Sequence, residues 1–173
     1  MVKQIFRALL EIATLRRGPQ DLPASGFFVG LMALLYVVTG IMSIAVYSSS
    51  ASQLLAQLAL DFVLLVGFFS LLLSMFRRAA RLRQTLAAIM GAGALLACFA
   101  LPLSVLLQSS APGDPSALIP ALGIYLIVLW SISINGHILQ RALEVPYVAG
   151  VLLAASYFIL NYIAFAYLFP AEI

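Results

Sequence analysis

Long apolar runs alternate with short polar interruptions along this chain of 173 residues. A helix that crosses a membrane needs about 20 mostly apolar residues to cover about 30 Å of hydrocarbon. Five runs reach that length, and each predicts one transmembrane helix: about Gly26–Tyr47, Gln53–Phe76, Gln84–Gln108, Ser116–Gln140 and Pro146–Phe169. We therefore expect an all-α integral membrane protein with five transmembrane helices.

The boundary between the fourth and fifth runs decides between five spans and four. Arg141, Glu144 and Pro146 lie there, and together they interrupt the apolar pattern. If the two runs were one span, about 50 apolar residues would have to make a single crossing, which is far more than a bilayer needs. The pattern therefore favours five spans.

The residues before the first run predict a short amphipathic helix from 2 to 15. Its apolar face holds Val2, Ile5, Phe6, Leu9, Leu10 and Ile12, and its polar face holds Lys3, Gln4, Arg7 and Glu11. Such a helix suits the membrane interface, with its apolar face in the headgroup boundary or against the bundle. Gly18 and Pro19 end it. The predicted organisation is a cytoplasmic amphipathic segment over 1–25 and a five-span bundle over 26–173.

Composition and charge add a direction to this pattern. The chain is 64% hydrophobic and 9% charged, whereas soluble domains carry about 25% charged residues. All nine basic residues fall into three clusters separated by pairs of apolar runs: Lys3, Arg7, Arg16 and Arg17, then Arg77, Arg78, Arg81 and Arg83, then Arg141. The gaps at 48–53 and 109–116 hold none. Because cytoplasmic loops are rich in Lys and Arg, we expect a cytoplasmic N-terminus and an external C-terminus.

The basic clusters lie beside membrane spans, and this placement favours contact with lipid over contact with nucleic acid. Arg77, Arg78, Arg81 and Arg83 form a compact loop between the second and third runs. A role in fixing the orientation is enough to explain them, and binding of anionic lipid headgroups is a plausible addition. We expect no nucleic-acid partner.

The start of the chain does not look like a cleavable signal peptide. A small-residue cleavage pattern after a short apolar core is absent, so we expect the first span to be retained.

Asp61 is the strongest candidate for chemistry, because a carboxylate inside a span is costly and usually faces a cavity or a partner. It lies about 12 Å from the external end at 1.5 Å per residue. The same arithmetic places Thr39, Tyr125 and Asn161 at a similar depth. These four residues form a candidate polar cluster, which is either a proton or cation site or a structural hydrogen-bond clasp.

His137 and Asn135 are candidate polar residues near the cytoplasmic end of the fourth span. His137 is the single histidine in the chain, so it cannot pair with a second histidine of the same chain. It is open to roles as a proton relay, as a metal or haem ligand, or as a packing residue, and packing is favoured because metal sites need several ligands. Its depth separates it from Asp61 by about 10 Å or more along the membrane normal.

Other chemical signals are weak. Cys98 is the single cysteine, so no internal disulfide forms and no cysteine-rich metal site is expected. The chain has no glycine-rich phosphate loop, zinc-protease motif or nucleophile elbow. We therefore expect a protein that is not an enzyme and has no cofactor.

Three pairs of small residues, each four positions apart, predict close helix packing. They are Gly26 with Gly30, Gly93 with Ala97, and Gly150 with Ala154. Such steps allow helix backbones to approach closely in lipid. Packing within one chain is the simpler interpretation, and homodimerisation through the first span is the more specific alternative.

Two stretches resemble the YIP family of Ypt/Rab-interacting-protein-like membrane proteins. The first is RLRQTLAAIMGAGALLACFALPLSVLL, with a basic entry, a small-residue core and the mid-span Pro102; the second is VLWSISINGHILQRALEVPYVAGVLLA, with a tryptophan, a basic turn and an alanine-rich return. The resemblance implies a cytoplasmic N-terminus followed by five clustered spans, without defined catalytic residues. The short N-terminal part and its RRGPQDLP sequence look more like a bacterial inner-membrane member.

These observations favour a non-enzymatic membrane protein with an organising or accessory role, acting through helix packing and contacts with lipid or protein. One alternative is a small oligomeric transporter or ion-coupled permease that uses Asp61. Another is a subunit of a larger membrane complex. A homo-oligomer or a partner membrane protein fits each of these interpretations.

Overall fold

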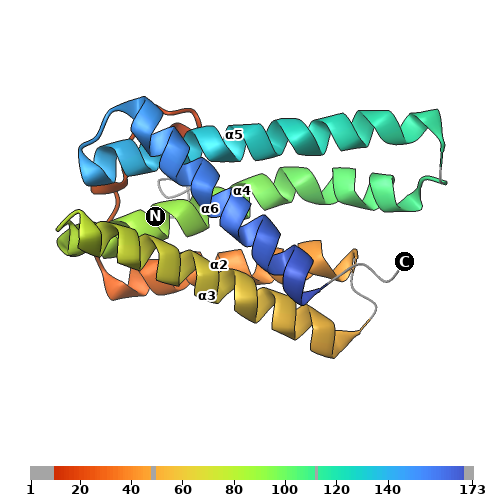
Figure 1. The fold of residues 1–173 in the computed structure, drawn as a ribbon, viewed down its shortest axis with the longest axis horizontal. Helices are drawn as coiled ribbons and strands as arrows, with labels where there is room; N and C mark the ends of the chain where they lie inside the picture. Colours follow the sequence, from red (N-terminus) through yellow and green to blue (C-terminus); the bar gives the residue numbers. More distant parts are fainter. Residues whose placement is uncertain (1–9, 48–49, 112, 170–173) are drawn as a thin grey trace.

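The computed structural model describes residues 10–47, 50–111 and 113–169. Five long helices make up the bundle (Figure 1): α2 (Gly26–Ala45), α3 (Ala51–Met75), α4 (Leu82–Ser109), α5 (Leu118–Leu143) and α6 (Tyr147–Leu168). Short 3-10 turns precede α2, α4 and α5: η1 (Pro19–Asp21), η2 (Ala79–Arg81) and η3 (Pro115–Ala117). All five long helices are long and apolar enough to cross a membrane, so the prediction of five spans is confirmed.

The ends of the helices follow local sequence signals. Ser25 and Ser50 cap α2 and α3, and each hydroxyl accepts a hydrogen bond from a backbone N–H in the first turn. Glu144 ends α5 in a left-handed conformation with φ of 59°, and α6 begins three residues later. This sharp turn separates the fourth span from the fifth, as the cluster around Arg141 predicts.

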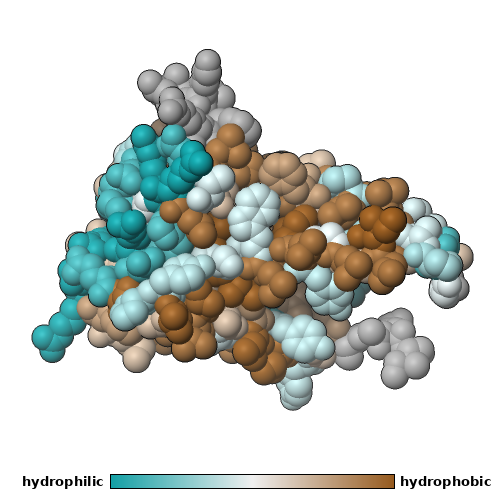
Figure 2. Space-filling view, turned by 90° about the horizontal axis from the view of Figure 1, so that it is seen from above, coloured by the Kyte–Doolittle hydropathy of each residue, from teal (hydrophilic) through white to brown (hydrophobic). Residues whose placement is uncertain are grey.

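The two ends of the bundle differ in polarity. We call the end that holds η1, η2 and the α5–α6 turn the charged end, and the end that holds the α2–α3 and α4–α5 connections the far end. Hydrophilic residues gather at the charged end, and apolar side chains cover the long helices (Figure 2). Seven of the nine basic residues lie in the described part of the chain, and all seven are at the charged end; Lys3 and Arg7 fall outside it.

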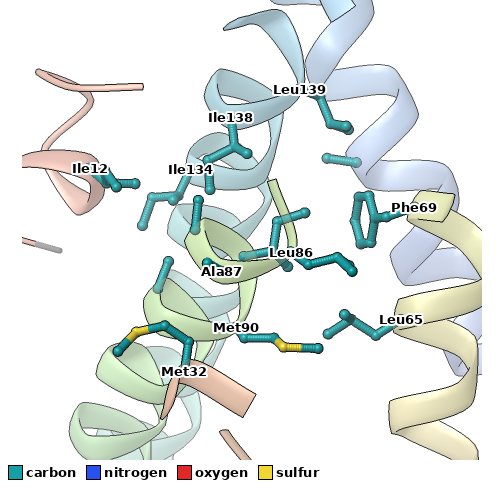
Figure 3. Packing of buried hydrophobic residues seen from close by; sticks show 14 of the residues in the cluster. Ile12, Met32, Leu65, Phe69, Leu86, Ala87, Met90, Ile134, Ile138 and Leu139 are labelled. Atoms are coloured by element: carbon teal, nitrogen blue, oxygen red, sulfur yellow. The ribbon is translucent and has the colours of Figure 1, made fainter. Parts of the chain in front are cut away.

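Helix α4 lies at the centre of the bundle, where it packs extensively against α2 and α5, and α6 packs mainly on α5. From the charged end, α6 runs diagonally across the bundle toward α3 (Figure 1). The buried core is concentrated in the half nearer the charged end. Its side chains there include Leu65, Phe69, Met90, Ile134 and Ile138, which are at most 2% exposed (Figure 3). The helices are therefore tightly packed toward the charged end and less so toward the far end.

The N-terminal segment packs against this bundle. Residues 10–13 are helical, and residues 2–9 of the predicted amphipathic helix lie outside the described residues. Ile12 and Leu22 belong to the same buried cluster as the spans. Of the two positions predicted for this segment, its described part takes the one against the bundle.

Three side chains of the spans hold the segment by its backbone. The indole N–H of Trp130 donates to the Ala13 carbonyl at 2.9 Å, and the Gln84 amide donates to the Leu22 carbonyl at 2.9 Å. His137 Nε2 lies 3.2 Å from the Arg17 carbonyl; since a carbonyl only accepts, this nitrogen carries the proton. These bonds satisfy carbonyls that would otherwise be costly beside the membrane.

Candidate functional site

A cavity of about 360 Å³ lies between the long helices, and all five contribute to its wall. At the far end its lining reaches Ser43 on α2 and Phe165 on α6, each within one turn of its helix end. At the other end its lining stops at Ile89 and Asn135, about two turns short of the ends of α4 and α5. The cavity therefore occupies the loosely packed half of the bundle, and the buried core closes it toward the charged end.

Asp61 supplies the carboxylate of this cavity. The hydroxyl of Tyr36 donates to its Oδ2 at 2.6 Å, and the amide of Asn161 donates to its Oδ1 at 3.1 Å. An ionised carboxylate only accepts hydrogen bonds, and O–H···O⁻ bonds are usually 2.5–2.7 Å long. The two donors therefore suit an ionised Asp61, and they join α2, α3 and α6 across the site.

The cavity contains no positive charge to balance Asp61. Among the described residues that line it there is no Lys, Arg or His. Its remaining polar groups are hydroxyls and amides: Thr39 and Ser43 on α2, Ser131 and Asn135 on α5, and the phenol of Tyr157 on α6. Aromatic rings of Tyr36, Tyr157, Phe158 and Phe165 form part of the wall. The cavity is thus mostly apolar, with a few polar groups and one acid.

The structure brings together three of the four residues of the predicted polar cluster. Asp61 and Asn161 are hydrogen-bonded, and Thr39 lines the same cavity. Tyr125 lies elsewhere, because its side chain is 70% exposed on the outer surface of α5. The phenol that bonds to Asp61 belongs to Tyr36 instead.

Asn135 and His137, predicted together near the cytoplasmic end of the fourth span, face different surroundings. Both side chains are buried. Asn135 lines the Asp61 cavity, whereas His137 faces the N-terminal segment and contacts the Arg17 carbonyl. The geometry of His137 matches the packing role, and no described group of three or more His, Cys, Asp or Glu is placed to hold a metal ion.

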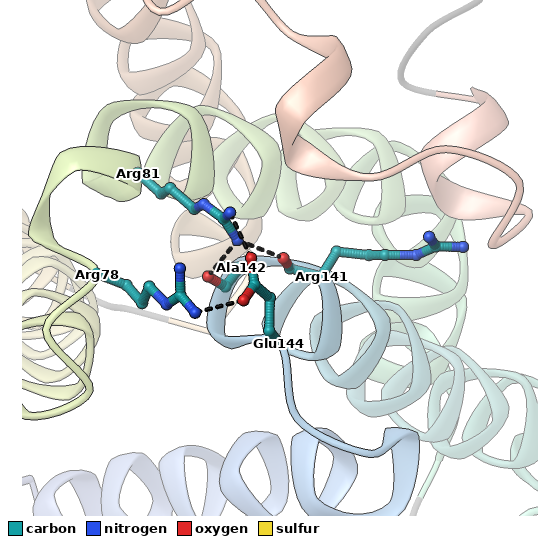
Figure 4. A network of polar contacts seen from close by, with 5 residues as sticks. All are labelled: Arg78, Arg81, Arg141, Ala142 and Glu144. Carbon is teal, nitrogen blue, oxygen red and sulfur yellow. Dashed lines mark hydrogen bonds and ion pairs between the residues drawn. The ribbon is translucent and has the colours of Figure 1, made fainter.

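Two arginines of the basic loop bind to the end of α5 in the same chain (Figure 4). Arg78 and Arg81 both pair with Glu144, and Arg81 also donates to the carbonyls of Arg141 and Ala142 at 3.1 Å. The hydrogen bond from Arg81, with the charges of both arginines, lowers the pKa of Glu144. Arg77 and Arg83 are exposed. Two of the four predicted headgroup ligands therefore tie the α3–α4 loop to the end of α5.

The pairs of small residues play different parts. Gly150 and Ala154 are buried where α6 meets α5, and Gly150 lies against Gly136, which the sequence analysis did not single out. Gly93 faces the Tyr36 ring, and its neighbour Ala97 lines the cavity. Gly26 and Gly30 are exposed, and a Cβ built on either one would meet no atom within 4 Å. This last pair does not pack against any residue that the structure describes.

Tyr36 is the main site residue that the sequence analysis missed. A signal for it exists, since Tyr36, Thr39, Gly40 and Ser43 follow one another at helical spacing and all line the cavity. A polar or small stripe on an otherwise apolar span marks a face that does not contact lipid. Such a stripe on α2 points to the face that Asp61 approaches.

Comparison with protein families, curated proteins and solved structures returned no match. The resemblance to the YIP family stays a prediction from the sequence.

Proposed function

We propose that this multi-span membrane protein is a small binding protein or carrier that holds a small solute in the Asp61 cavity. The cavity itself carries the proposal, because residues from all five helices line about 360 Å³ beside one hydrogen-bonded carboxylate. Ligand sites in proteins are typically of this size, mostly apolar and furnished with a few convergent polar groups. The proposal assigns no catalytic step to the site.

The uneven packing of the bundle also supports a binding role over a purely structural one. A structural clasp needs Asp61 and its two donors, but it needs no space beside them, and interiors are normally close-packed. Here the charged half is dense and the cavity occupies the other half.

The orientation predicted from the basic loops places the charged end in the cytoplasm. The cavity would then face the outside of the cell, and a bacterial inner membrane is the expected location.

Transport and binding assays on reconstituted protein test this proposal. The purified chain is placed in proteoliposomes and offered amines, amino acids, sugars and organic acids, and uptake and thermal stabilisation are measured. We expect the wild type to take up, or to be stabilised by, at least one solute class. This effect should be about tenfold or more weaker in Asp61→Asn, because the partly buried carboxylate is the principal polar anchor. Asp114→Asn is the matched control, since Asp114 is an exposed acid in the far-end loop. Absence of uptake and stabilisation for every class would contradict the proposal.

A second candidate is the accessory or subunit role, and it is favoured by a surface of α2 that no described residue covers. Gly26 and Gly30 face open space, and Phe27 between them is 77% exposed. Small residues at such a spacing let a second helix approach closely in a bilayer. That helix would belong to a second copy or to a partner membrane protein. Purification from mildly solubilised membranes tests this role, and a lone monomer in which Gly30→Leu changes nothing would contradict it.

A further inference from the structure

We infer that the Asp61 cavity selects a small organic monocation, such as an alkyl or arylalkyl ammonium ion, as its ligand. This inference rests on the proposed binding function and names the chemical class of the ligand. It depends on three features of the cavity wall: its charge, its aromatic rings and the way in which its carboxylate is already bonded.

The charge of the wall favours a cation. Asp61 is the one acid among the described lining residues, and no basic side chain lines the cavity with it. Burying an uncompensated charge in a low-dielectric medium is costly, and a bound cation offsets that cost. An anionic ligand would add a second negative charge beside the first, and a neutral one would leave Asp61 without a counter-charge.

The aromatic rings favour an organic cation over a metal ion. Tyr36 on α2 and Tyr157, Phe158 and Phe165 on α6 contribute to the wall. The faces of such rings attract ammonium groups, most strongly where water is excluded. A hard metal ion instead needs several oxygen ligands, and the wall supplies one carboxylate with a few hydroxyls and amides. Apolar side chains fill most of the remaining wall and suit the hydrocarbon part of an amphipathic ion.

The hydrogen bonds of Asp61 hold its carboxylate in a fixed position where an ammonium ion can pair with it. Tyr36 and Asn161 already donate one hydrogen bond to each carboxylate oxygen. The carboxylate is held in place by these donors, and its negative charge still acts over the cavity. A quaternary ammonium, which has no N–H, pairs with such a group through charge and contact alone.

Binding of two probes of the same shape tests the inference on the purified full chain in lipid nanodiscs. Benzyltrimethylammonium carries a permanent charge, and neopentylbenzene replaces its nitrogen by carbon. We expect wild-type protein to bind the cation about tenfold or more tightly than the hydrocarbon, because carboxylate pairing and cation–π contact act on the cation alone. Asp61→Asn keeps the shape of the side chain and should abolish the preference, while Asp114→Asn should retain it.

The outcomes separate this inference from the proposed function. Equal binding of both probes would overturn the cation preference and leave an apolar site, such as one for a lipid chain. Preference for the cation that survives in Asp61→Asn would also overturn the inference. Binding of neither probe, alongside binding of another solute class, would overturn the ligand class but keep the binding function. Because the two probes are first compared on the wild type, the test stands even if Asp61→Asn fails to fold.

Discussion

The backbones of Gly136 on α5 and Gly150 on α6 touch. A Cβ atom built on Gly150 would lie 2.3 Å from the Gly136 carbonyl oxygen, and one built on Gly136 would lie 2.8 Å from the Val151 Cα. Small residues permit such approach in a bilayer, where van der Waals packing drives helix association. This contact fixes α6 to α5 near the charged end, from which α6 diverges across the bundle (Figure 1).

Substitution of Gly150 should therefore weaken the bundle. We expect Gly150→Ala to lower the free energy of unfolding by about 1–3 kcal/mol, because the added methyl group meets backbone atoms that cannot rotate away. Gly67→Ala on α3 is the control, since a Cβ there meets no atom within 4 Å. Unfolding in mixed micelles measures both variants, and equal stability would contradict the close contact.

The N-terminal segment should come loose when its hydrogen bonds to the spans are removed. Trp130→Phe deletes the donor to the Ala13 carbonyl, and one hydrogen bond contributes about 0.5–1.5 kcal/mol net. We expect trypsin to cleave after Arg16 or Arg17 about two- to tenfold faster in this variant, as followed by mass spectrometry. Ser133→Ala is the control, because that hydroxyl bonds within α5 to the Leu129 carbonyl. An unchanged cleavage rate in Trp130→Phe would contradict the docking.

The ion pairs of Glu144 should make the charged end sensitive to acid. Because Arg81 and Arg78 lower the pKa of Glu144 from its ordinary value of 4.5, the folded state favours the ionised form. This stabilisation is present above about pH 4.5 and is lost as the pH falls through the lowered folded-state pKa. We expect the thermal midpoint of the wild type to fall more between pH 7 and pH 3 than that of Glu144→Gln. If the thermal midpoints of the two proteins fall by the same amount, the ion pairs contribute nothing to stability.

The orientation of the chain is predicted from its basic loops and can be tested by direct labelling. In a Cys98→Ala background, Ala80→Cys reports on the charged end and Ser116→Cys on the far end. We expect a membrane-impermeant maleimide added to intact cells to label Ser116→Cys. Ala80→Cys should be labelled only after permeabilisation, because cytoplasmic loops are generally rich in Lys and Arg. The reverse pattern would place the cavity on the cytoplasmic side.

The sequence predicts the spans much better than the contacts between them. Hydropathy counts apolar residues, and a bilayer requires long apolar helices, so the five spans follow directly. In lipid, however, a helix is apolar on its exposed and buried faces alike, and periodicity does not separate them as it does in water. Tyr36 and Tyr125 illustrate this limit, since one bonds to Asp61 and the other is exposed.

The ion pair between Arg81 and Glu144 at the charged end cannot be predicted from the sequence either. Arg81 and Glu144 lie 63 positions apart, and their contact depends on how α4 packs against α5. The packing role of Gly136 is not visible in the sequence, because the small residue that it contacts, Gly150, lies on another helix. Asp61 was found from sequence because a carboxylate in a span stands out by itself, whereas the cavity beside it arises from the divergence of the helices.

Thiol accessibility tests the central claim, that a solute-accessible cavity surrounds Asp61. Ser131 lines this cavity, whereas Ser133, on the same helix, is not among its lining residues. Each is replaced by cysteine in a Cys98→Ala background and treated with cationic and anionic methanethiosulfonates. We expect Ser131→Cys to react, with a preference of about tenfold for the cationic reagent that disappears when Asp61→Asn is added, because the carboxylate attracts cations locally. If Ser131→Cys in the folded protein is as inert as Ser133→Cys, while both react in denaturant, the account is contradicted.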